Sequence, residues 1–316
     1  MTRLSLLIGV GLAIISSAAS AQDKVKYGTA IKLSPVYYLP VLAAQEHGIF
    51  AKNKLSVEWV PSESGPDMQR NLASGVIDLG SSTGATDIPA ISRGVPTMIV
   101  ANLQPTDGFW VWVTTNSRFQ KPQDLNGVKF GVARLSGAEH AYGLLVAKQL
   151  GLKDVQFVGT GGIRESLAVL VTGGIDGVIL QPQNLIELKL QGKIKELVSV
   201  LDYLPKPWLS YTVTASKAMI EKRPDVLKRT VDSIFEANRY VMSPAGKDWA
   251  IKTMMAQNKY SLEGANLIYP QLALSPNGKT TKEAVENVSK FLADYGLMKA
   301  GEAAKADALF TDQFIR

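Results

Sequence analysis

Short apolar runs alternate with amphipathic runs along the first third of the chain, and this alternation limits the folds open to it. Apolar runs of this kind are typical of buried strands, and the amphipathic runs between them are typical of covering helices. We predict strands over Val25–Ile31, Leu55–Val60, Val76–Gly80 and Thr97–Leu103, and helices over Leu39–Ala51, Asp67–Ala73 and Ala85–Ser92. Gly48, Gly75 and Gly94 close these helices. The pattern predicts an α/β fold with a mainly parallel sheet.

A second α/β set follows the polar turn Gln104–Gly108. Its expected strands cover residues 109–115, 128–132, 155–158, 177–180 and 197–200, and its expected helices cover 139–150, 165–171 and 185–190. Tyr211–Ala215 is a return strand, and the chain is helical from Lys217 to about Leu309. We therefore predict two lobes and two crossings, with 22–108 as the first part of lobe I, 109–210 as lobe II and 211–316 as the rest of lobe I.

A short internal echo also indicates two lobes of one design. Ser74–Asp78 (SGVID) resembles Thr172–Asp176 (TGGID), and each segment follows an amphipathic helix and leads into a strand. Five residues do not prove a duplication, but the shared context favours it.

Residues 1–21 have the layout of an export signal. Arg3 lies in a short basic start, an apolar run covers Leu4–Ile15, and small residues end at Ala21, so we expect cleavage before Gln22. The apolar run is shorter than the roughly 20 residues that a membrane-spanning helix needs. The alternative, an apolar first helix of the fold, is weaker because folded segments seldom mimic this layout.

The composition excludes several classes of protein. The chain has no cysteine, which rules out disulfides, a cysteine nucleophile and a lipid-anchored export signal. The net charge of +6 is spread along the chain, whereas a nucleic-acid-binding protein shows a basic stripe. No later stretch approaches membrane-spanning length. We expect a free monomer in a Gram-negative periplasm, although export alone does not distinguish periplasm from medium.

Polar loops at the carboxyl ends of the predicted strands are the candidate ligand site, because ligands of open α/β sheets bind there. Small hydroxyl residues beside glycine, just before a helix, leave backbone N–H groups free for an anion. Arg134 adds a bidentate hydrogen-bonding fork. For any single cluster, helix capping is the simpler interpretation. The candidates in these loops are Ser34, Ser64, Gly65, Ser82, Thr83, Gly84, Arg134, Ser136, Gly137 and Gln181.

Aromatic residues in expected loops and crossings give a second signal. Tyr37, Tyr38, Trp208 and Tyr211 lie outside strand centres, where aromatic walls hold an organic body. For Trp208, a site role and a core role have equal support. The alternating Phe109, Trp110 and Trp112 instead indicate core packing.

Catalytic motifs are sparse. His47 and His140 are the only histidines, too few for a histidine-rich metal centre, and no Gly-x-Ser-x-Gly elbow is present. Gly159–Gly162 lacks the third glycine of a dinucleotide fingerprint. Asp78 and Asp176 are interpreted as turn residues at strand starts. We therefore expect no enzyme activity, no cofactor and no metal.

In their order and spacing, several short motifs resemble the nitrate, sulfonate and taurine class of ABC-transporter substrate-binding proteins. They are Ser34–Tyr38, Ala44–Phe50, Leu55–Glu58, Leu72–Gly80, Arg93–Pro96, Asp124–Val132 and Lys222–Leu227. The resemblance covers nearly the whole chain after residue 21. It implies a two-lobed type II periplasmic binding fold that closes on a small molecule and delivers it to a membrane permease with a cytoplasmic ATPase.

The resemblance also bears on the ligand. Ser136, Gly137 and His140 fall where similar proteins place a ligand loop and a histidine, whereas Leu180–Gln181 stands where many relatives have a tryptophan before the proline. We expect a small organic anion, such as a sulfonate, carboxylate or aromatic acid. The open alternatives are a pyrimidine-precursor protein of the thiamine-related branch, whose enzymes carry a cysteine-rich motif, and the ligand-binding module of a membrane sensor.

Overall fold

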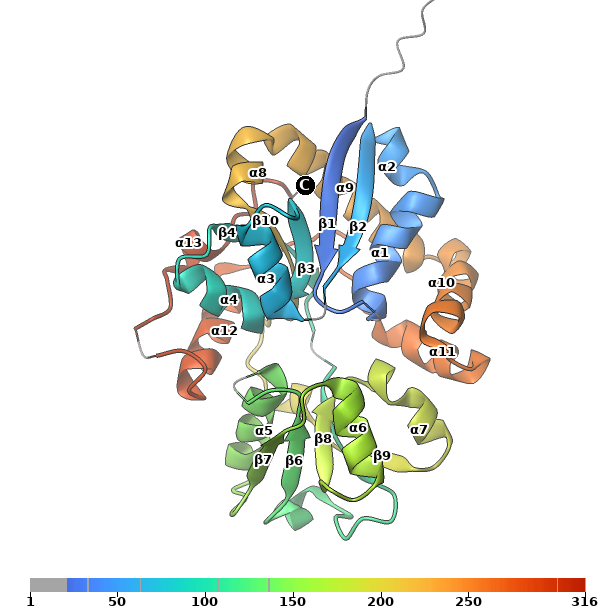
Figure 1. Cartoon of the computed structure of the whole chain (residues 1–316), viewed down its shortest axis with the longest axis vertical. Coiled ribbons are helices and arrows are strands. Elements are labelled where there is room, and N and C mark those ends of the chain that lie inside the picture. Colours follow the sequence, from blue (N-terminus) through green and yellow to red (C-terminus); the bar gives the residue numbers. More distant parts are fainter. Residues whose placement is uncertain are drawn as a thin grey trace, which may run out of the picture.

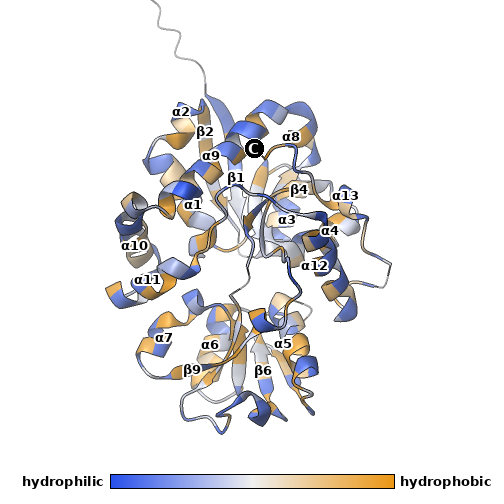
Figure 2. Cartoon of the chain, turned by 180° about the vertical axis from the view of Figure 1, so that it is seen from behind, coloured by the Kyte–Doolittle hydropathy of each residue, from blue (hydrophilic) through white to orange (hydrophobic). Residues whose placement is uncertain are grey.

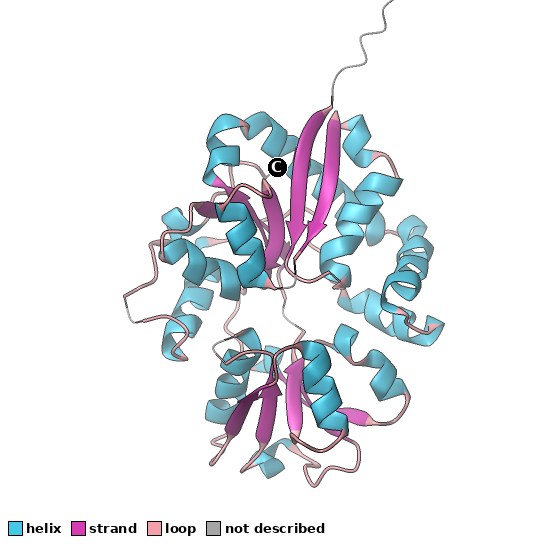
Figure 3. Cartoon of the chain, in the orientation of Figure 1, coloured by secondary structure: helices cyan, strands magenta, loops and turns pink. Residues whose placement is uncertain are grey.

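The computed structural model of the protein describes residues 22–32, 34–62, 64–106, 108–135, 137–299 and 301–315. The expected export signal and the candidate Ser136 lie outside the described residues. Figure 1 shows two α/β lobes joined by the crossings, and Figure 3 shows the strands inside each lobe with helices around them. The two-lobed α/β fold expected from the sequence is confirmed.

Lobe I contains a five-stranded sheet of order β2-β1-β3-β10-β4. β1 is parallel to β2 and β3, whereas β10 is antiparallel to β3 and β4. The strands are β1 (Asp23–Thr29), β2 (Leu55–Pro61), β3 (Leu79–Thr83), β4 (Thr97–Gln104) and β10 (Tyr211–Ser216). The helices are α1 (Pro35–Glu46), α2 (Ile49–Lys52), α3 (Gly65–Ala73), α4 (Gly84–Ser92), α8 (Lys217–Lys222), α9 (Pro224–Val241), α10 (Pro244–Asn258), α11 (Leu262–Ile268), α12 (Lys282–Asp294) and α13 (Ala306–Leu309).

Lobe II repeats this plan with the order β7-β6-β8-β5-β9. β6 is parallel to β7 and β8, and β5 is antiparallel to β8 and β9. The strands are β5 (Trp110–Thr114), β6 (Lys129–Val132), β7 (Gln156–Gly159), β8 (Gly177–Leu180) and β9 (Ile194–Ser199), and the helices are α5 (Ala138–Gln149), α6 (Ile163–Val171) and α7 (Ile186–Leu190). Short 3-10 turns lie at Pro122–Leu125, Pro182–Asn184, Val200–Asp202 and Tyr269–Gln271.

The internal echo occupies the same place in both lobes. The carboxylate of Asp78 accepts a hydrogen bond from the backbone N–H of Lys26 at 2.8 Å, and that of Asp176 accepts one from Lys129 at 2.8 Å. Each aspartate thus binds the backbone of the first parallel strand of its lobe. Their interpretation as turn residues is confirmed.

The apolar core of lobe II continues into the helical last third of the chain. Trp112 is fully buried in lobe II, and its indole N–H donates to the carbonyl of Leu180 at 2.8 Å. Phe291 of α12 lies 5.6 Å, between ring centroids, from Tyr142 of lobe II. Figure 2 shows hydrophilic and hydrophobic residues alternating along the helices of both lobes, as expected for helices that cover a core. No helix in the described ranges is long and apolar enough to cross a membrane.

Several expected elements have different bounds in the structure. The helix expected over Leu39–Ala51 is two helices, because Gly48 takes a left-handed conformation (φ 68°) between them. α1 also begins earlier, at Pro35, so it includes Tyr37 and Tyr38. β3 begins at Leu79 instead of Val76 and includes Ser82 and Thr83, because these residues pair with β10.

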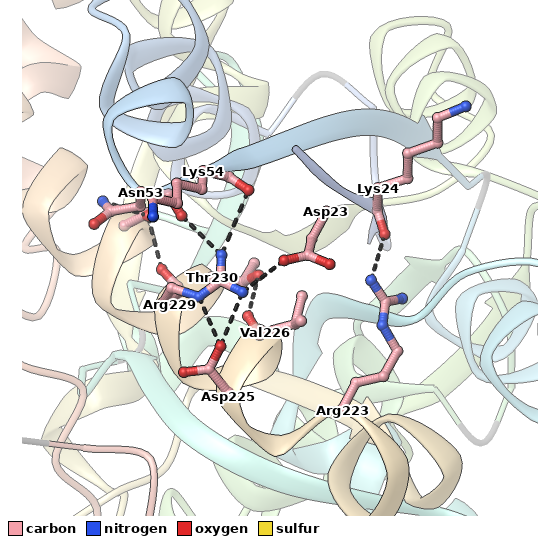
Figure 4. Close-up of polar contacts among 10 residues, drawn as sticks. Asp23, Lys24, Asn53, Lys54, Arg223, Asp225, Val226, Arg229 and Thr230 are labelled. Carbon is pink, nitrogen blue, oxygen red and sulfur yellow. Dashed lines mark hydrogen bonds and ion pairs between the residues drawn. The ribbon is translucent and has the colours of Figure 1, made fainter. Parts of the chain in front are cut away.

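Arg229 of α9 fixes the beginning of β1. Its guanidinium binds the carboxylates of Asp23 at 2.7 Å and Asp225 at 2.9 Å, and also donates to the carbonyl of Asn53 at 2.9 Å (Figure 4). The hydrogen bond to Asp23 raises the pKa of Arg229. The first strand of the sheet is therefore held by a helix from the last third of the chain.

Candidate ligand site between the two lobes

The two lobes meet at Tyr211 and Gln181. Tyr211 begins β10 opposite Thr83 in lobe I, and Gln181 directly follows β8 in lobe II. The Gln181 amide donates a hydrogen bond to the Tyr211 hydroxyl, and both residues are buried. The loop after β8 thus reaches the sheet of the other lobe.

Candidates at the starts of helices α1 and α4 of lobe I lie beside Tyr211 and the preceding Ser210. The ring of Tyr37 lies edge-on to that of Tyr211 with centroids 5.0 Å apart. The Gly84 N–H donates to the carbonyl of Ser210 at 2.9 Å. At Gly65, an added Cβ would lie 3.1 Å from the Ser82 hydroxyl, so the start of α3 is in close contact with β3.

Helix capping explains two of the hydroxyl candidates. Ser64 accepts from the N–H of Asp67 at 3.3 Å, and Thr83 accepts from the N–H of Thr86 at 3.3 Å. Ser34 stands at the N-cap position of α1 without a side-chain cap bond. The buried Ser82 hydroxyl lies near the Asp87 carboxyl but reaches hydrogen-bond geometry with no described residue. Ser34 and Ser82 therefore retain hydrogen-bonding capacity.

The carboxyl group of Asp87 binds the strand that carries Tyr211. The sequence did not predict this role. Asp87 is fully buried on α4 and accepts hydrogen bonds from Thr212, from Thr214 at 2.6 Å and from Gln69 at 2.7 Å. Burial raises the pKa of Asp87, and the hydrogen bonds, led by that from Thr212, oppose the rise. An acidic residue inside the apolar run of α4 was the available signal.

In lobe II, Arg134 and the start of α5 offer hydrogen-bond donors. The Arg134 side chain is exposed and makes no hydrogen bond or ion pair with a described residue. Gly137 stands at the N-cap of α5, which has no side-chain cap there, and its N–H donates to the Arg134 carbonyl at 3.1 Å. An exposed guanidinium beside a helix start whose N-cap residue makes no side-chain cap bond suits an anion.

Glu139 lies at the start of the same helix. From the sequence, this residue was predicted only to begin the helix. Burial raises its pKa to about 7, although its own backbone N–H opposes the rise. The carboxyl folds back over the N-cap, since an added Cβ on Gly137 would lie 3.4 Å from it. A carboxyl that titrates near neutral pH thus stands where an external anion was expected.

Three candidates face elsewhere. His140 lies edge-on to Phe157 of β7 with ring centroids 4.7 Å apart, and burial lowers its pKa. The hydroxyl of Tyr38 donates to Asn258 at the end of α10. The ring of Trp208 lies edge-on to Phe291 of α12, 5.3 Å away, so it packs beside the crossings. Tyr38 and Trp208 thus contact α10 and α12, respectively.

A second contact between the lobes was missed by the sequence analysis. Glu187 of α7 accepts hydrogen bonds from the backbone N–H of Ser261 at 2.8 Å and from its hydroxyl at 3.0 Å. Tyr260 beside it donates to the carbonyl of Gln183. No local pattern signals a contact between residues separated by 74 positions. In the described ranges, no group of acidic or histidine side chains is arranged to hold a metal ion.

Comparison with known proteins identifies the family. A sequence profile described as "NMT1/THI5 like" matches residues 36–245, so the chain belongs to the NMT1/THI5-like family. A curated relative, the taurine-binding periplasmic protein of Escherichia coli K12, is 28% identical over 213 residues. That match covers 65% of this chain and 64% of the relative. The resemblance to the nitrate, sulfonate and taurine class is confirmed.

Solved structures share the fold at low sequence identity. The aliphatic sulphonate binding protein SsuA of Escherichia coli superposes with a TM-score of 0.75 at 18% identity, covering 91% of this chain and 92% of that one. SsuA of Xanthomonas axonopodis bound to MOPS gives 0.76 at 16% identity, covering 92% and 99%. The nitrate-binding protein NrtA of Synechocystis gives 0.76 at 14% identity, covering 93% and 87%.

Proposed function

We propose that this protein is the periplasmic solute-binding component of an ABC importer and binds a small organic anion between its two lobes. The observation that carries the proposal is the meeting of donor-bearing segments from both lobes, with Gln181 of lobe II hydrogen-bonded to Tyr211 of lobe I. The similarity to a taurine-binding periplasmic protein supports the ligand class and the permease partner. The lobes swing about the crossings near Gly108 and Ser210, and no reaction follows binding.

The chemistry of the two walls suits an anion with an organic body. Arg134 and the N-terminus of α5 bind the charged group, and the Ser82 hydroxyl adds a donor from lobe I. The edge-to-face rings of Tyr37 and Tyr211 hold the organic part. Closure expels water and strengthens these hydrogen bonds.

Thermal-shift screening tests the proposal. The panel contains taurine and longer alkanesulfonates, aromatic carboxylates, nitrate and pyrimidines. A ligand that binds only the folded state raises the melting temperature, so we expect an organic anion to do this. Failure of every anion to stabilise folded protein would overturn the proposal. Stabilisation by pyrimidines alone would favour the thiamine-related alternative, and turnover of a bound compound would show an enzyme.

Anion affinity should fall as the pH rises through about 7. The pKa of Glu139 is raised to about 7, so the carboxyl is neutral below that value and negatively charged above it. Once charged, it repels an anion at the start of α5. Titration calorimetry with the best anion at pH values on both sides of 7 measures the effect. Glu139→Gln should flatten this profile, and an unchanged profile in the variant would exclude Glu139 as its source.

Breaking the contact between α7 and α11 should weaken ligand binding by about fivefold, because a hydrogen-bond pair of this kind contributes about 1 kcal/mol to the closed arrangement. Glu187→Ala removes the acceptor for Ser261, whereas Glu187→Gln keeps an oxygen in the same place. We expect near-normal affinity for the glutamine variant. Equal affinities in both variants and in wild type, measured by calorimetry, would show that this contact does not act in closure.

A further inference from the structure

A cavity of about 290 Å³ lies beside the crossings, apart from the strand-end loops. Its walls come from the first crossing (Pro105 and Thr106), the second crossing (205–208), Asn102 of β4 and the segment that leads into α12 (279–281). Of the described residues of the expected ligand site, Trp208 alone lines it. An apolar cavity of about 150 Å³ already holds a benzene-sized molecule, so this one has room for a substituted ring.

Three buried side-chain atoms of the lining lack hydrogen-bond partners in the described part of the chain: the Asn102 Oδ1, the Trp208 Nε1 and the Thr280 Oγ1. Asn102 is 3% exposed and Trp208 is 4% exposed, yet the Asn102 Oδ1 and the Trp208 Nε1 make no hydrogen bond within the described part of the chain. By contrast, the indole N–H groups of Trp59 and Trp249 donate at 3.0 and 2.8 Å. A buried polar group without a partner costs stability, so a ligand that supplies one is favoured.

The rim of the cavity is positively charged. Lys206 and Lys279 line it, both are exposed, and neither forms an ion pair with a described residue. Among the described residues, no acidic side chain belongs to the lining. Thr281 and Ala284, at the N-terminus of the 13-residue helix α12, complete this wall and add the positive end of a helix dipole. The rim is therefore complementary to an anionic group.

We propose that this cavity binds a small hydroxylated carboxylate with an apolar body. The carboxylate pairs with Lys206 and Lys279, and the body lies among Leu201, Pro205 and Ala284. A hydroxyl group accepts from the Trp208 N–H and donates to the Asn102 oxygen, which satisfies both buried groups at once. This second site is separate from the site between the lobes, since the two share no charged residue.

The cavity also touches both segments that join the lobes, together with Leu201 of lobe II. An occupant therefore contacts the hinge from the side. An occupant that binds more tightly to one arrangement of the lobes changes the affinity for the interlobe ligand. The interlobe ligand then changes the affinity of the cavity for its occupant by the same factor.

Indole N–H signals in ¹H–¹⁵N spectra of the whole chain test the proposal with 4-hydroxybenzoate as the probe. The chain has five tryptophans, and Trp208→Phe identifies the Trp208 signal by its loss. We expect 4-hydroxybenzoate to shift this signal far more than those of Trp59 and Trp249. Benzoate, which lacks the hydroxyl, and 4-hydroxybenzyl alcohol, which lacks the charge, should both bind more weakly.

Charge variants separate this site from the interlobe site. At low salt, Lys206→Gln with Lys279→Gln should weaken 4-hydroxybenzoate by about tenfold. Lys252→Gln on α10 removes a distant exposed lysine and should not weaken it. Arg134→Ala should also leave the Trp208 shift intact. An unmoved Trp208 signal, or a shift that disappears in Arg134→Ala and survives in the lysine variant, would overturn the proposal.

Discussion

Replacing Asp87 by alanine should lower the free energy of unfolding by about 3 kcal/mol, because three buried donors lose their acceptor. These donors are the hydroxyls of Thr212 and Thr214 and the amide of Gln69. Urea unfolding followed by tryptophan fluorescence measures the change. Asp87→Asn is the control, since it keeps an acceptor oxygen and the shape of the side chain, and it should cost much less.

The same residue gives stability a defined pH dependence. Burial raises the pKa of Asp87, so the folded state holds its proton to higher pH than the unfolded state does. The contribution of Asp87 is therefore largest below the unfolded pKa and is lost as the pH rises through the folded pKa. Asp87→Asn should remove this part of the pH dependence. Equal losses of stability in the alanine and asparagine variants at every pH would contradict the account.

Arg134→Ala should weaken the interlobe ligand by about 30-fold, which corresponds to about 2 kcal/mol for the loss of a desolvated charge pair. Arg134 is exposed and makes no bond to a described residue, so it is available to an incoming anion. Calorimetry with the best anion from the thermal-shift panel gives the ratio of dissociation constants.

Lys153→Ala is the matched control for Arg134. Lys153 is an exposed cation in the same lobe, and its backbone carbonyl accepts from Gly127 before the start of β6, at the opposite end of that strand from Arg134. Its removal changes the net charge equally and should leave the affinity unchanged. If both variants bind like wild type, Arg134 has no part in the site.

The sequence predicted the order of the elements well where each element carries its own signal. β8 lies at Gly177–Leu180, as expected, because a short apolar run marks both of its ends. The end of β3 was misplaced because Ser82 and Thr83 become strand only by pairing with β10, a segment about 130 positions later. Local patterns do not contain partners at that distance.

The site was predictable in its parts but not in its assembly. Loops with free backbone donors were visible as Ser-Gly clusters, whereas the Gln181–Tyr211 and Glu187–Ser261 contacts depend on how the lobes meet. Trp208 shows the same limit, since the sequence supported a site role and a core role equally. Its ring packs on Phe291, which belongs to the helical last third of the chain.

The distance between the lobes, with and without ligand, tests the central proposal most directly. The chain has no cysteine, so Lys153→Cys and Lys252→Cys place one spin label on each lobe at exposed positions. Double electron–electron resonance then gives the distribution of distances between the two spin labels. We predict that a stabilising organic anion narrows this distribution and shifts it to shorter distances, and that Arg134→Ala prevents the shift at the same ligand concentration. A bound anion that leaves the distribution unchanged would contradict closure of the lobes on the ligand.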